Sequence, residues 1–223
     1  MNLSMKNNQL LIDFAESSTK GMDLTNMKVK QFRVELITIQ EATTIIKDWH
    51  YSGSTNGLMV SHCFGLFHDQ TLIGTIIYGG LAMANAWKKY ADNPSDVVEL
   101  RRLACIDATP KNTESYFIGK TIRWLKKNTD YKLIVSYADP FHGHAGVIYK
   151  ASNFEHKGMT SKGKMIEDHD GRLFHDKAIR TTYTNKDGVK ALKPFAARLK
   201  QRLQDGDAKY INTPGKHIYT YKL

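Results

Sequence analysis

The sequence predicts an α/β fold, of the α+β kind, in which a mixed central β-sheet carries helices on both faces. Two observations favour this fold class. Strand-like apolar segments alternate with segments whose apolar residues recur at helical spacing, and this alternation follows an early pair of apolar strands. The chain also has 223 residues, of which 41% are hydrophobic, and this is enough for one large core.

The first predicted elements are a strand, a helix and a hairpin. The segment FRVELIT alternates as a half-buried strand does, and Thr38 with Glu41 forms a capping box before a helix that runs to Trp49. The apolar segments 57–67 and 72–80 flank the polar turn HDQT. Two apolar segments around a short polar turn indicate two antiparallel strands.

The later elements alternate between strand and helix. VVELRRLACI predicts a strand, SYFIGKTIRWLKK a helix, YKLIVSYAD a strand and HAGVIYKASNF a short helix. Pro194 predicts either the start of a late helix or a kink in it, because proline cannot donate a backbone hydrogen bond. The final segment PGKHIYTYKL alternates again and is expected to complete the sheet as its last strand.

The domain organisation follows from this pattern. Residues 1–28 are polar, rich in methionine and weakly patterned, which predicts a poorly ordered N-terminal extension. Residues 29–223 are predicted to form a single domain with a basic C-terminal segment. No apolar run approaches the roughly 20 residues of a membrane span, and the N-terminus lacks the layout of a signal peptide. We therefore expect a cytoplasmic protein, whose Cys63 and Cys105 are buried, reduced thiols.

The charge of the chain indicates a polyanionic partner. Lys and Arg number 32 against 22 Asp and Glu, which gives a net charge of +10. The excess is concentrated near the C-terminus and would suit a nucleic-acid face that holds phosphates without reading sequence. Its candidate residues are Lys193, Arg198, Lys200, Arg202 and Lys216. A solvated helix surface is the alternative explanation of such a run.

Several short segments carry a resemblance to known families. The strand and helix order, together with Tyr149 to Phe154 after the fifth strand, resembles the GNAT acyltransferase fold, whose Tyr-x-x-x-Gly-Phe segment appears here with Asn153 in the glycine position. More closely, six segments in order resemble the Mom DNA-modification proteins of bacteriophages: HYSG, ELRRL, PKNTESYFIG, SYAD, GHAGVIYKASNF and PGKH. That resemblance covers roughly residues 32–222.

The resemblance implies a function. It implies a GNAT-like transferase that converts adenine in phage DNA to an N6-carbamoylmethyl or related acyl-type adenine, which protects the DNA from restriction, in the host cytoplasm if the chain is phage-encoded. Double-stranded DNA is then the partner, and no membrane and no protein partner is predicted. The alternatives are an N-acetyltransferase that uses acetyl-CoA on a small amine or protein lysine, and a DNA-binding protein without catalysis.

Tyr149 and Asp139 are the first candidates for catalysis. The GNAT resemblance gives Tyr149 the role of general acid, because a phenol with a pKa near 10 keeps its proton at pH 7 and can release it to a departing thiolate. A core tyrosine is the alternative. Asp139 follows a strand, at the edge where open α/β sheets bind ligands, although a turn hydrogen bond beside Pro140 would equally explain it. Ser136 and Tyr137 occupy opposite faces of that strand, and we expect Ser136 to face the site.

Arginine and histidine supply the remaining catalytic candidates. Arg101 and Arg102 alternate along a strand, so one of them should reach the site and hold an anionic or donor group. His50 ends the first helix and is a candidate base, with a helix cap as the alternative. A base taken out of the duplex would stack on flat side chains, for which the candidates are Trp49, Tyr51, Trp87 and Tyr137.

Of all the features of the site, the cofactor is the one that the sequence constrains least. An acyl donor such as acetyl-CoA would be held by Arg102, Ser115 and Gly119, but KNTESYFIG has one glycine where GNAT enzymes have a glycine-rich loop. Glu114 would oppose a pyrophosphate there, although it also suits the first turn of a helix. An iron or zinc site is the weaker alternative, and its candidate ligands are His50, Asp139, His142 and His144.

Overall fold

The computed structural model describes residues 21–83 and 85–223. Contacts within the chain divide it into two compact units, where the sequence predicts one domain over residues 29–223. Unit 1 comprises the described residues up to Ala138 together with His144–Gly158 and His217–Leu223, and unit 2 comprises Asp139–Gly143 and Met159–Lys216. The chain thus leaves unit 1 briefly after β5, returns for α4 and β6, leaves again after β6, and comes back for the last strand.

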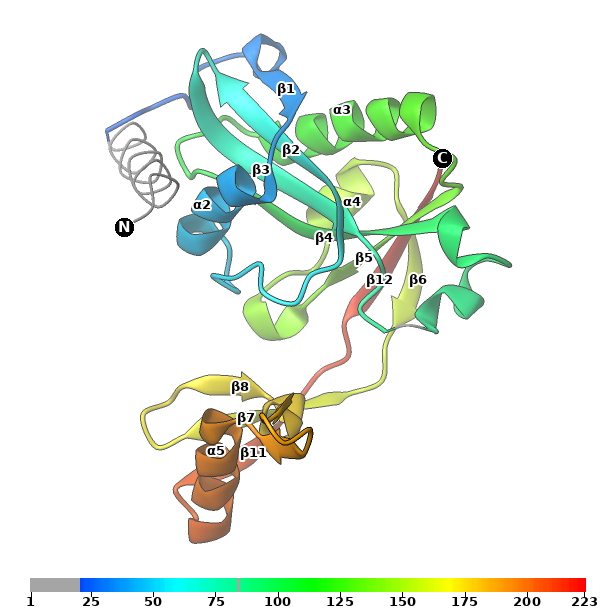
Figure 1. The fold of residues 1–223 in the computed structure, drawn as a ribbon. Coiled ribbons are helices and arrows are strands. Elements are labelled where there is room, and N and C mark those ends of the chain that lie inside the picture. The colour runs from blue at the N-terminus through cyan, green and yellow to red at the C-terminus, as the bar shows by residue number, and fades with distance from the viewer. Residues whose placement is uncertain (1–20, 84) are drawn as a thin grey trace. The chain divides into compact units, whose positions relative to one another are not determined.

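Unit 1 is built on a seven-stranded sheet in the order β1-β2-β3-β4-β5-β12-β6 (Figure 1). Neighbouring strands run antiparallel from β1 to β4, β4 and β5 are parallel, and β5 and β12 are again antiparallel. The predicted hairpin and the predicted final strand are confirmed, and the final strand lies inside the sheet, between β5 and β6. The strands are β1 (Arg33–Leu36), β2 (Val60–His68), β3 (Thr71–Gly79), β4 (Val97–Cys105), β5 (Leu133–Ala138), β6 (Glu155–Met159) and β12 (His217–Lys222).

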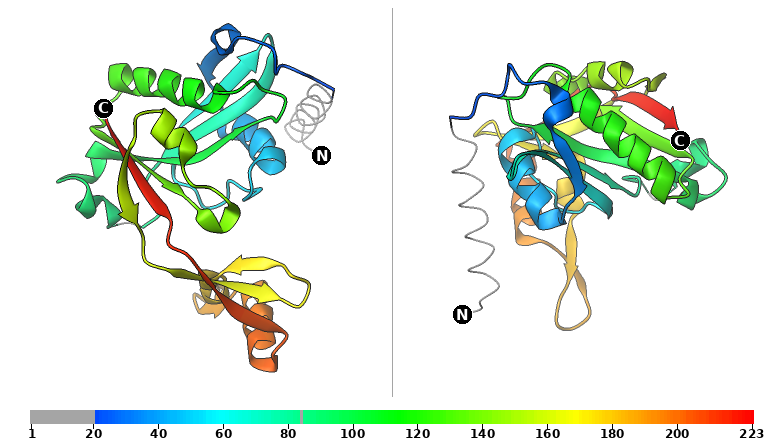
Figure 2. Two further views of the ribbon diagram at one scale, coloured as in Figure 1. Left: turned by 180° about the vertical axis from the view of Figure 1, so that it is seen from behind. Right: turned by 90° about the horizontal axis from the view of Figure 1, so that it is seen from above.

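Helices cover both faces of this sheet, as predicted. Figures 1 and 2, which view the molecule from opposite sides, show α2 (Ile39–Trp49) on one face and α3 (Thr113–Asn128) with α4 (Val147–Ala151) on the other. Among the described residues, the short 3₁₀ helices of unit 1 are η1 (Val29–Gln31), η2 (Ala86–Lys89) and η3 (Pro94–Asp96). The predicted mixed sheet with helices on both faces is therefore confirmed.

The start of α2 shows how local sequence fixes an element. The Thr38 side chain accepts a hydrogen bond from the Glu41 backbone N–H, and the Glu41 carboxylate accepts one from the Thr38 N–H at 2.7 Å. This is the capping box that the sequence predicts. The helix buries Ala42, Ile45 and Ile46 in the core of unit 1.

The N-terminal extension is described only in part. Residues 1–20 of the extension predicted over 1–28 lie outside the described residues. Residues 21–28 are held to the core, because Leu24 is buried and its N–H donates to the carbonyl oxygen of Ala108 at 2.9 Å. The packed chain therefore begins before the predicted boundary at residue 29.

Unit 2 has its own small core. A three-stranded sheet in the order β11-β7-β8 packs against α5 (Pro194–Asp205), and its buried centre is formed by Ile166, Leu199 and Ala208. Pro194 is the first residue of α5, which confirms the predicted start of the late helix and leaves no kink. The other elements of the unit, in chain order, are η4 (Pro140–His142), β7 (Gly163–Asp168), β8 (Leu173–His175), η5 (Asp176–Arg180), β9 (Thr182–Thr184), β10 (Lys190–Leu192) and β11 (Ala208–Thr213).

Over residues 21–83 and 85–223, no helix is both long enough and apolar enough to cross a membrane.

Candidate active site

The candidate site in unit 1 lies where the parallel pairing of β4 and β5 ends. The last paired residues are Leu100 and Ser136, although β4 continues to Cys105 and β5 to Ala138. The Ser136 hydroxyl is buried and donates to the Leu100 carbonyl oxygen at 3.2 Å. Open sheets of this kind place ligands beside the carboxyl ends of their strands, where neighbouring strands diverge.

Tyr149 stands beside this point. It lies on α4, its side chain is only 7% exposed, and its ring packs against the rings of Phe154 and Tyr219, with centroid distances of 5.5 and 5.2 Å. Burial raises the pKa of Tyr149 to about 12, and a hydrogen bond with Ser136 opposes that rise. Tyr149 is therefore packed among aromatic and polar groups, and its phenol is protonated at neutral pH.

A buried ion pair lies on β4. The Arg101 Nη1 donates to the Gly80 carbonyl oxygen at 2.9 Å and is 3.3 Å from the Glu99 Oε2, and the two side chains are 11% and 9% exposed. The same Glu99 oxygen accepts the backbone N–H of Ala82 at 3.0 Å. The charge of Glu99 is also close enough to raise the pKa of Tyr149 further, although less than burial does.

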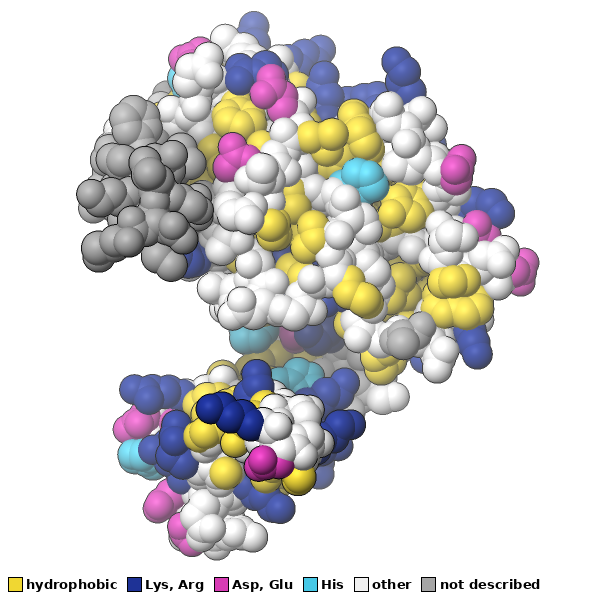
Figure 3. Space-filling view, in the orientation of Figure 1, with side chains coloured by type: hydrophobic (Ala, Val, Ile, Leu, Met, Phe, Trp, Pro, Cys, Tyr) yellow, Lys and Arg dark blue, Asp and Glu magenta, His cyan; other side chains and the backbone are white. Residues whose placement is uncertain are grey.

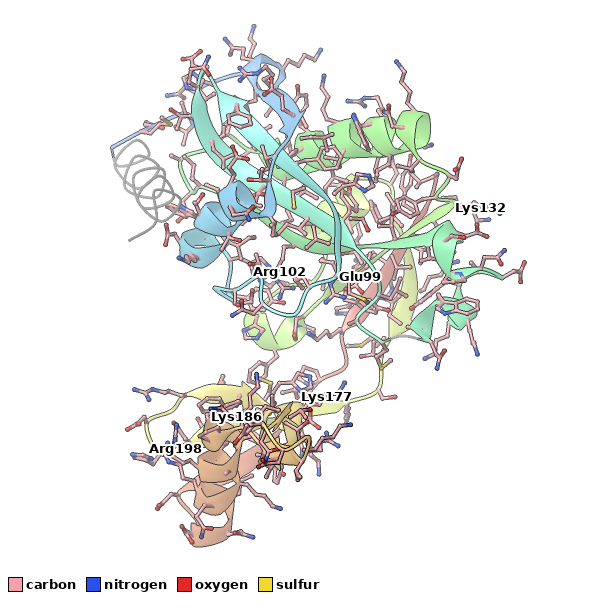
Figure 4. All side chains as sticks on the ribbon, viewed as in Figure 1. Glu99, Arg102, Lys132, Lys177, Lys186 and Arg198 are labelled. Carbon is pink, nitrogen blue, oxygen red and sulfur yellow. The ribbon has the colours of Figure 1, made fainter. Side chains whose placement is uncertain are left out.

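Arg101 occupies a β-bulge, which changes the prediction made for the two arginines. Ile77 pairs with Arg102 and Tyr78 pairs with Leu100, so Arg101 is the extra residue on β4. A bulge interrupts the alternation of side chains along a strand. Both arginines, instead of one, therefore lie near Glu99. Figure 4 labels Arg102 and Glu99. Burial lowers the pKa of Arg102, while the nearby Tyr51 acts in the opposite direction.

His50 and Tyr51 form an aromatic stack at the end of α2. The Tyr51 ring is 4.3 Å from the His50 ring and 5.2 Å from the His144 ring, and Tyr51 is 48% exposed. The Ser52 N–H donates to the His50 Nδ1 at 3.1 Å. That nitrogen is therefore an acceptor, and the proton of a neutral ring is on Nε2. The backbone N–H of His50 supplies a capping bond to the Ile46 carbonyl oxygen at the end of α2.

Asp139 belongs to unit 2. Its carboxylate is buried, accepts the Phe141 N–H at 3.1 Å and forms an ion pair with the Lys216 Nζ at 2.8 Å. The turn hydrogen bond that the sequence offers as an alternative role is thus present. Lys216, which the sequence predicts to contact DNA, is therefore already engaged in an ion pair with this carboxylate.

The predicted metal ligands do not form a cluster. The rings of His50 and His144 both contact the Tyr51 ring in unit 1, whereas Asp139 and His142 belong to unit 2. Nowhere in the part of the chain that the structure describes do three His, Cys, Asp or Glu side chains come together as a metal would need. The iron alternative therefore has no set of ligands in the described residues.

The predicted cofactor residues at α3 do not fit a pyrophosphate. Gly119 lies within α3 and not in a loop, and the Ser115 hydroxyl donates to the Asn112 carbonyl oxygen at 3.0 Å. Glu114 places a negative charge in the first turn of the helix. Because a helix N-terminus that binds phosphate needs free N–H groups without a competing carboxylate, these residues do not form a coenzyme A cradle of the usual kind.

The predicted stacking residues are dispersed. Tyr137 lies on the opposite face from Ser136, its hydroxyl is 3.1 Å from that of Tyr90, and it packs in a separate cluster with Trp87. Ser136 is thus the residue of the pair that reaches Tyr149, as the sequence predicts. Trp49 and Tyr51 are both exposed, and of these Tyr51 belongs to the aromatic stack.

The predicted DNA-binding residues fall into two groups. Lys193, Arg198 and Lys200 are exposed on and before α5. Arg202 instead has a structural role, because its Nη1 is 3.1 Å from the carboxylate of Asp168, whose side chain is almost fully buried. Arg202 ties α5 to β7 and is therefore a poor candidate for a phosphate contact.

Comparison with known proteins identifies the family. The model of the Mom protein family matches residues 31–223. The Methylcarbamoylase mom of Escherichia phage Mu is 33% identical over 153 residues, which are 66% of this chain. This match spans about three fifths (61%) of the length of that relative.

Likeness to solved structures is weaker. An acetyltransferase of Bacillus subtilis in complex with CoA shares 12% identity at a TM-score of 0.48, over 86% of this chain and 99% of that one. An N-acetyltransferase of Staphylococcus aureus Mu50 shares 11% identity at a TM-score of 0.43, over 86% and 97%. Likeness at this level assigns no residue and no ligand to the site. The family model, in contrast, spans every residue of the candidate site, and the chain belongs to the Mom protein family.

Proposed function

We propose that this chain is a DNA-modifying transferase that converts adenine in DNA to N6-carbamoylmethyladenine or a closely related acyl-type base. Its membership of the Mom family, with a relative named as a methylcarbamoylase, is the observation that supports this most strongly. The described site is compatible with the chemistry, because it joins a protonated phenol, a buried hydroxyl and a buried arginine.

Tyr149 is proposed as the general acid. The adenine amine releases a proton to solvent as it attacks the donor, and the leaving group takes the proton of the phenol, which is restored from solvent. A phenol with a pKa of about 12 keeps its proton at neutral pH and delivers it only to a group that becomes strongly basic as its bond breaks. The Ser136 hydroxyl, which donates to the Leu100 carbonyl oxygen, can turn to donate to the phenolate that forms, in line with its lowering effect on the pKa of Tyr149.

Arg101 and His50 are proposed to orient the reactants. The Glu99 carboxylate and the Gly80 carbonyl hold one nitrogen of the Arg101 guanidinium, which keeps a planar cation fixed near β4. The His50 ring presents an Nε2 proton, because Nδ1 accepts from Ser52, so it is proposed as a hydrogen-bond donor in place of a base. Asp139 is proposed to be required for turnover as well, and Asp139→Asn tests this assignment separately.

Tyr51 is proposed to stack on the extruded adenine. An amine inside a duplex is out of reach, so the base must be flipped out at a cost of a few kcal/mol and held against flat side chains. Tyr51 is the exposed ring of the His50 and His144 stack. A Tyr51→Ala variant should therefore bind DNA but modify it poorly.

Nucleoside mass spectrometry of DNA from cells that express the chain tests the proposal. The wild-type chain should give an adenine nucleoside that carries one carbamoylmethyl group, and Tyr149→Phe should not. Tyr131→Phe is the matched control, because it removes a phenol from a partly buried site elsewhere in unit 1. Unmodified DNA together with turnover of acetyl-CoA would indicate an acetyltransferase, and salt-dependent DNA binding without either would indicate a silent DNA-binding protein.

A further inference from the structure

A two-stranded hairpin of unit 2 is exposed along its first strand. In β9 all of Thr182, Tyr183 and Thr184 are exposed, and their partners on β10 are Leu192, Ala191 and Lys190. The right-hand view of Figure 2 shows this hairpin, in gold, as an arm that extends from the other elements of its unit. A hairpin with so little apolar burial is marginally stable alone, so its shape must come from its turn and its base.

The turn is held rigidly by one side chain. The Asn185 Oδ1 accepts the N–H groups of Asp187 and Val189, at 3.0 and 2.8 Å. Gly188 has a φ of +78°, which glycine adopts without strain, and its N–H donates to the Asn185 carbonyl oxygen at 3.1 Å. The tip that carries Lys186 is therefore preorganised.

The base of the hairpin is joined directly to α5. The Lys193 N–H donates to the Thr181 carbonyl oxygen at 2.8 Å, and the next residue, Pro194, begins the helix. Leu199 on α5 packs in the core of unit 2. We call residues 181–200, which comprise the hairpin and the first turns of α5, the basic arm.

The basic arm has an unusual charge. It contains five cations and one acid, Asp187, and no further acidic residue follows until Asp205. In the described chain none of these cations forms an ion pair, whereas other cations of unit 2 do, such as Arg172 with Asp170 and Lys209 with Glu167. Figures 3 and 4 show Lys and Arg side chains gathered over unit 2, including Lys186 and Arg198. The five are Lys186, Lys190, Lys193, Arg198 and Lys200.

From these observations we propose that the basic arm is the surface that docks double-stranded DNA, with Lys186 and Lys190 on phosphates and the ribbon lying along a groove. This inference rests on the proposed function, in which DNA is the substrate. A two-stranded ribbon fits the major groove, which is about 12 Å wide. Unpaired cations on a preorganised ribbon can neutralise phosphates and release counterions with little loss of side-chain freedom, whereas cations paired with carboxylates must first give up those ion pairs.

Fluorescence anisotropy with a short labelled duplex and the full-length chain tests this proposal. The test variant is Lys186→Ala with Lys190→Ala, and the control is Arg172→Ala with Lys209→Ala, which changes the net charge equally but removes cations that are already paired. The test variant should bind roughly tenfold more weakly, and its log-log salt slope should fall by about 1.8, or about 0.9 for each lost phosphate contact. The control should stay within about twofold of the wild type in affinity.

Equal losses in the two double variants would overturn the inference, because net charge alone would then explain binding. Circular dichroism checks that both variants are folded. The proposed function is judged separately, by nucleoside analysis of the wild type. If no adenine adduct forms, the proposed function fails while the anisotropy comparison still decides the role of the arm. If the adduct forms and the two variants bind DNA equally, only the arm is refuted.

Discussion

Tyr149 holds its proton at neutral pH because its hydroxyl is buried beside Ser136 and among aromatic rings. The GNAT resemblance makes this residue a candidate, and the alternation of side chains along the strand favours Ser136 over Tyr137. The sequence does not predict that Glu99 belongs to the site, because an acidic residue in a strand usually lies at the surface. The signal that could have found it is the ELRR run itself: a carboxylate two residues before Arg101 lies on the same strand face and can pair with it.

Glu99 is expected to position Arg101. Glu99→Gln keeps an acceptor for the Ala82 N–H but removes the charge opposite a largely buried guanidinium. We expect it to lower the free energy of unfolding by about 2–4 kcal/mol and to reduce the rate of adenine modification. Adding Arg101→Met should recover stability but not activity, as measured by thermal denaturation and nucleoside analysis in a double-mutant cycle. Additive losses of stability in the double variant would show that the two residues act independently.

His62 is expected to make stability fall at mildly acidic pH. Burial lowers the pKa of its ring, and its Nδ1 is buried without a hydrogen-bond partner among the described residues. Because the unfolded chain, with a His pKa near 6.5, binds a proton more readily than the folded one, stability is full above about pH 6.5 and declines below it. His62→Phe removes this titrating group, so the melting temperature of the variant should decline less between neutral and acidic buffer than that of the wild type. Parallel pH profiles for the two proteins would contradict the assignment.

At the scale of elements, the short helix α4 depends on a close contact with β12. Gly146 precedes the helix with a φ of +74°, and a Cβ at that position would lie 2.2 Å from the Tyr219 ring. The Tyr219 hydroxyl donates to the Ala145 carbonyl oxygen at 2.8 Å. Since the Tyr219 ring also packs on Tyr149, this contact places the proposed acid.

Replacement of that glycine should therefore disturb both stability and activity. Gly146→Ala combines an unfavourable positive φ with a clash against the Tyr219 ring, so we expect a loss of about 3 kcal/mol in unfolding free energy and strongly reduced modification. Gly57→Ala is the matched control, because its φ is +73° and nothing lies within 4 Å of the added Cβ. Its cost should be about 1 kcal/mol, with activity retained. Chemical denaturation that gives equal losses for both would show that the ring contact is unimportant.

Local elements were predictable where their signals lie close together in sequence. The capping box at Thr38 and Glu41 and the proline at the start of α5 each fix an element within a few residues. The bulge at Arg101 was not predictable, because it depends on how β3 pairs with β4. The ion pair between Asp139 and Lys216 joins residues far apart in sequence, so no local sequence pattern predicts it.

At the scale of the whole molecule, unit 2 is an insertion between two strands that are neighbours in one sheet. β6 and β12 lie side by side in unit 1, and the residues between them form most of the second unit. The sequence did not reveal this division, because the strands of unit 2 are short and its apolar core is small. This insertion carries the basic arm, which is the part of the chain that we propose for DNA docking.

The adenine content of DNA from cells that express the chain is the most direct test of the whole account. We predict a carbamoylmethylated adenine nucleoside with the wild-type chain, its loss with Tyr149→Phe and its persistence with Tyr131→Phe. Unmodified adenine with a well-folded, well-expressed wild-type chain would contradict the central claim, and an undiminished adduct with Tyr149→Phe would contradict the role of the phenol.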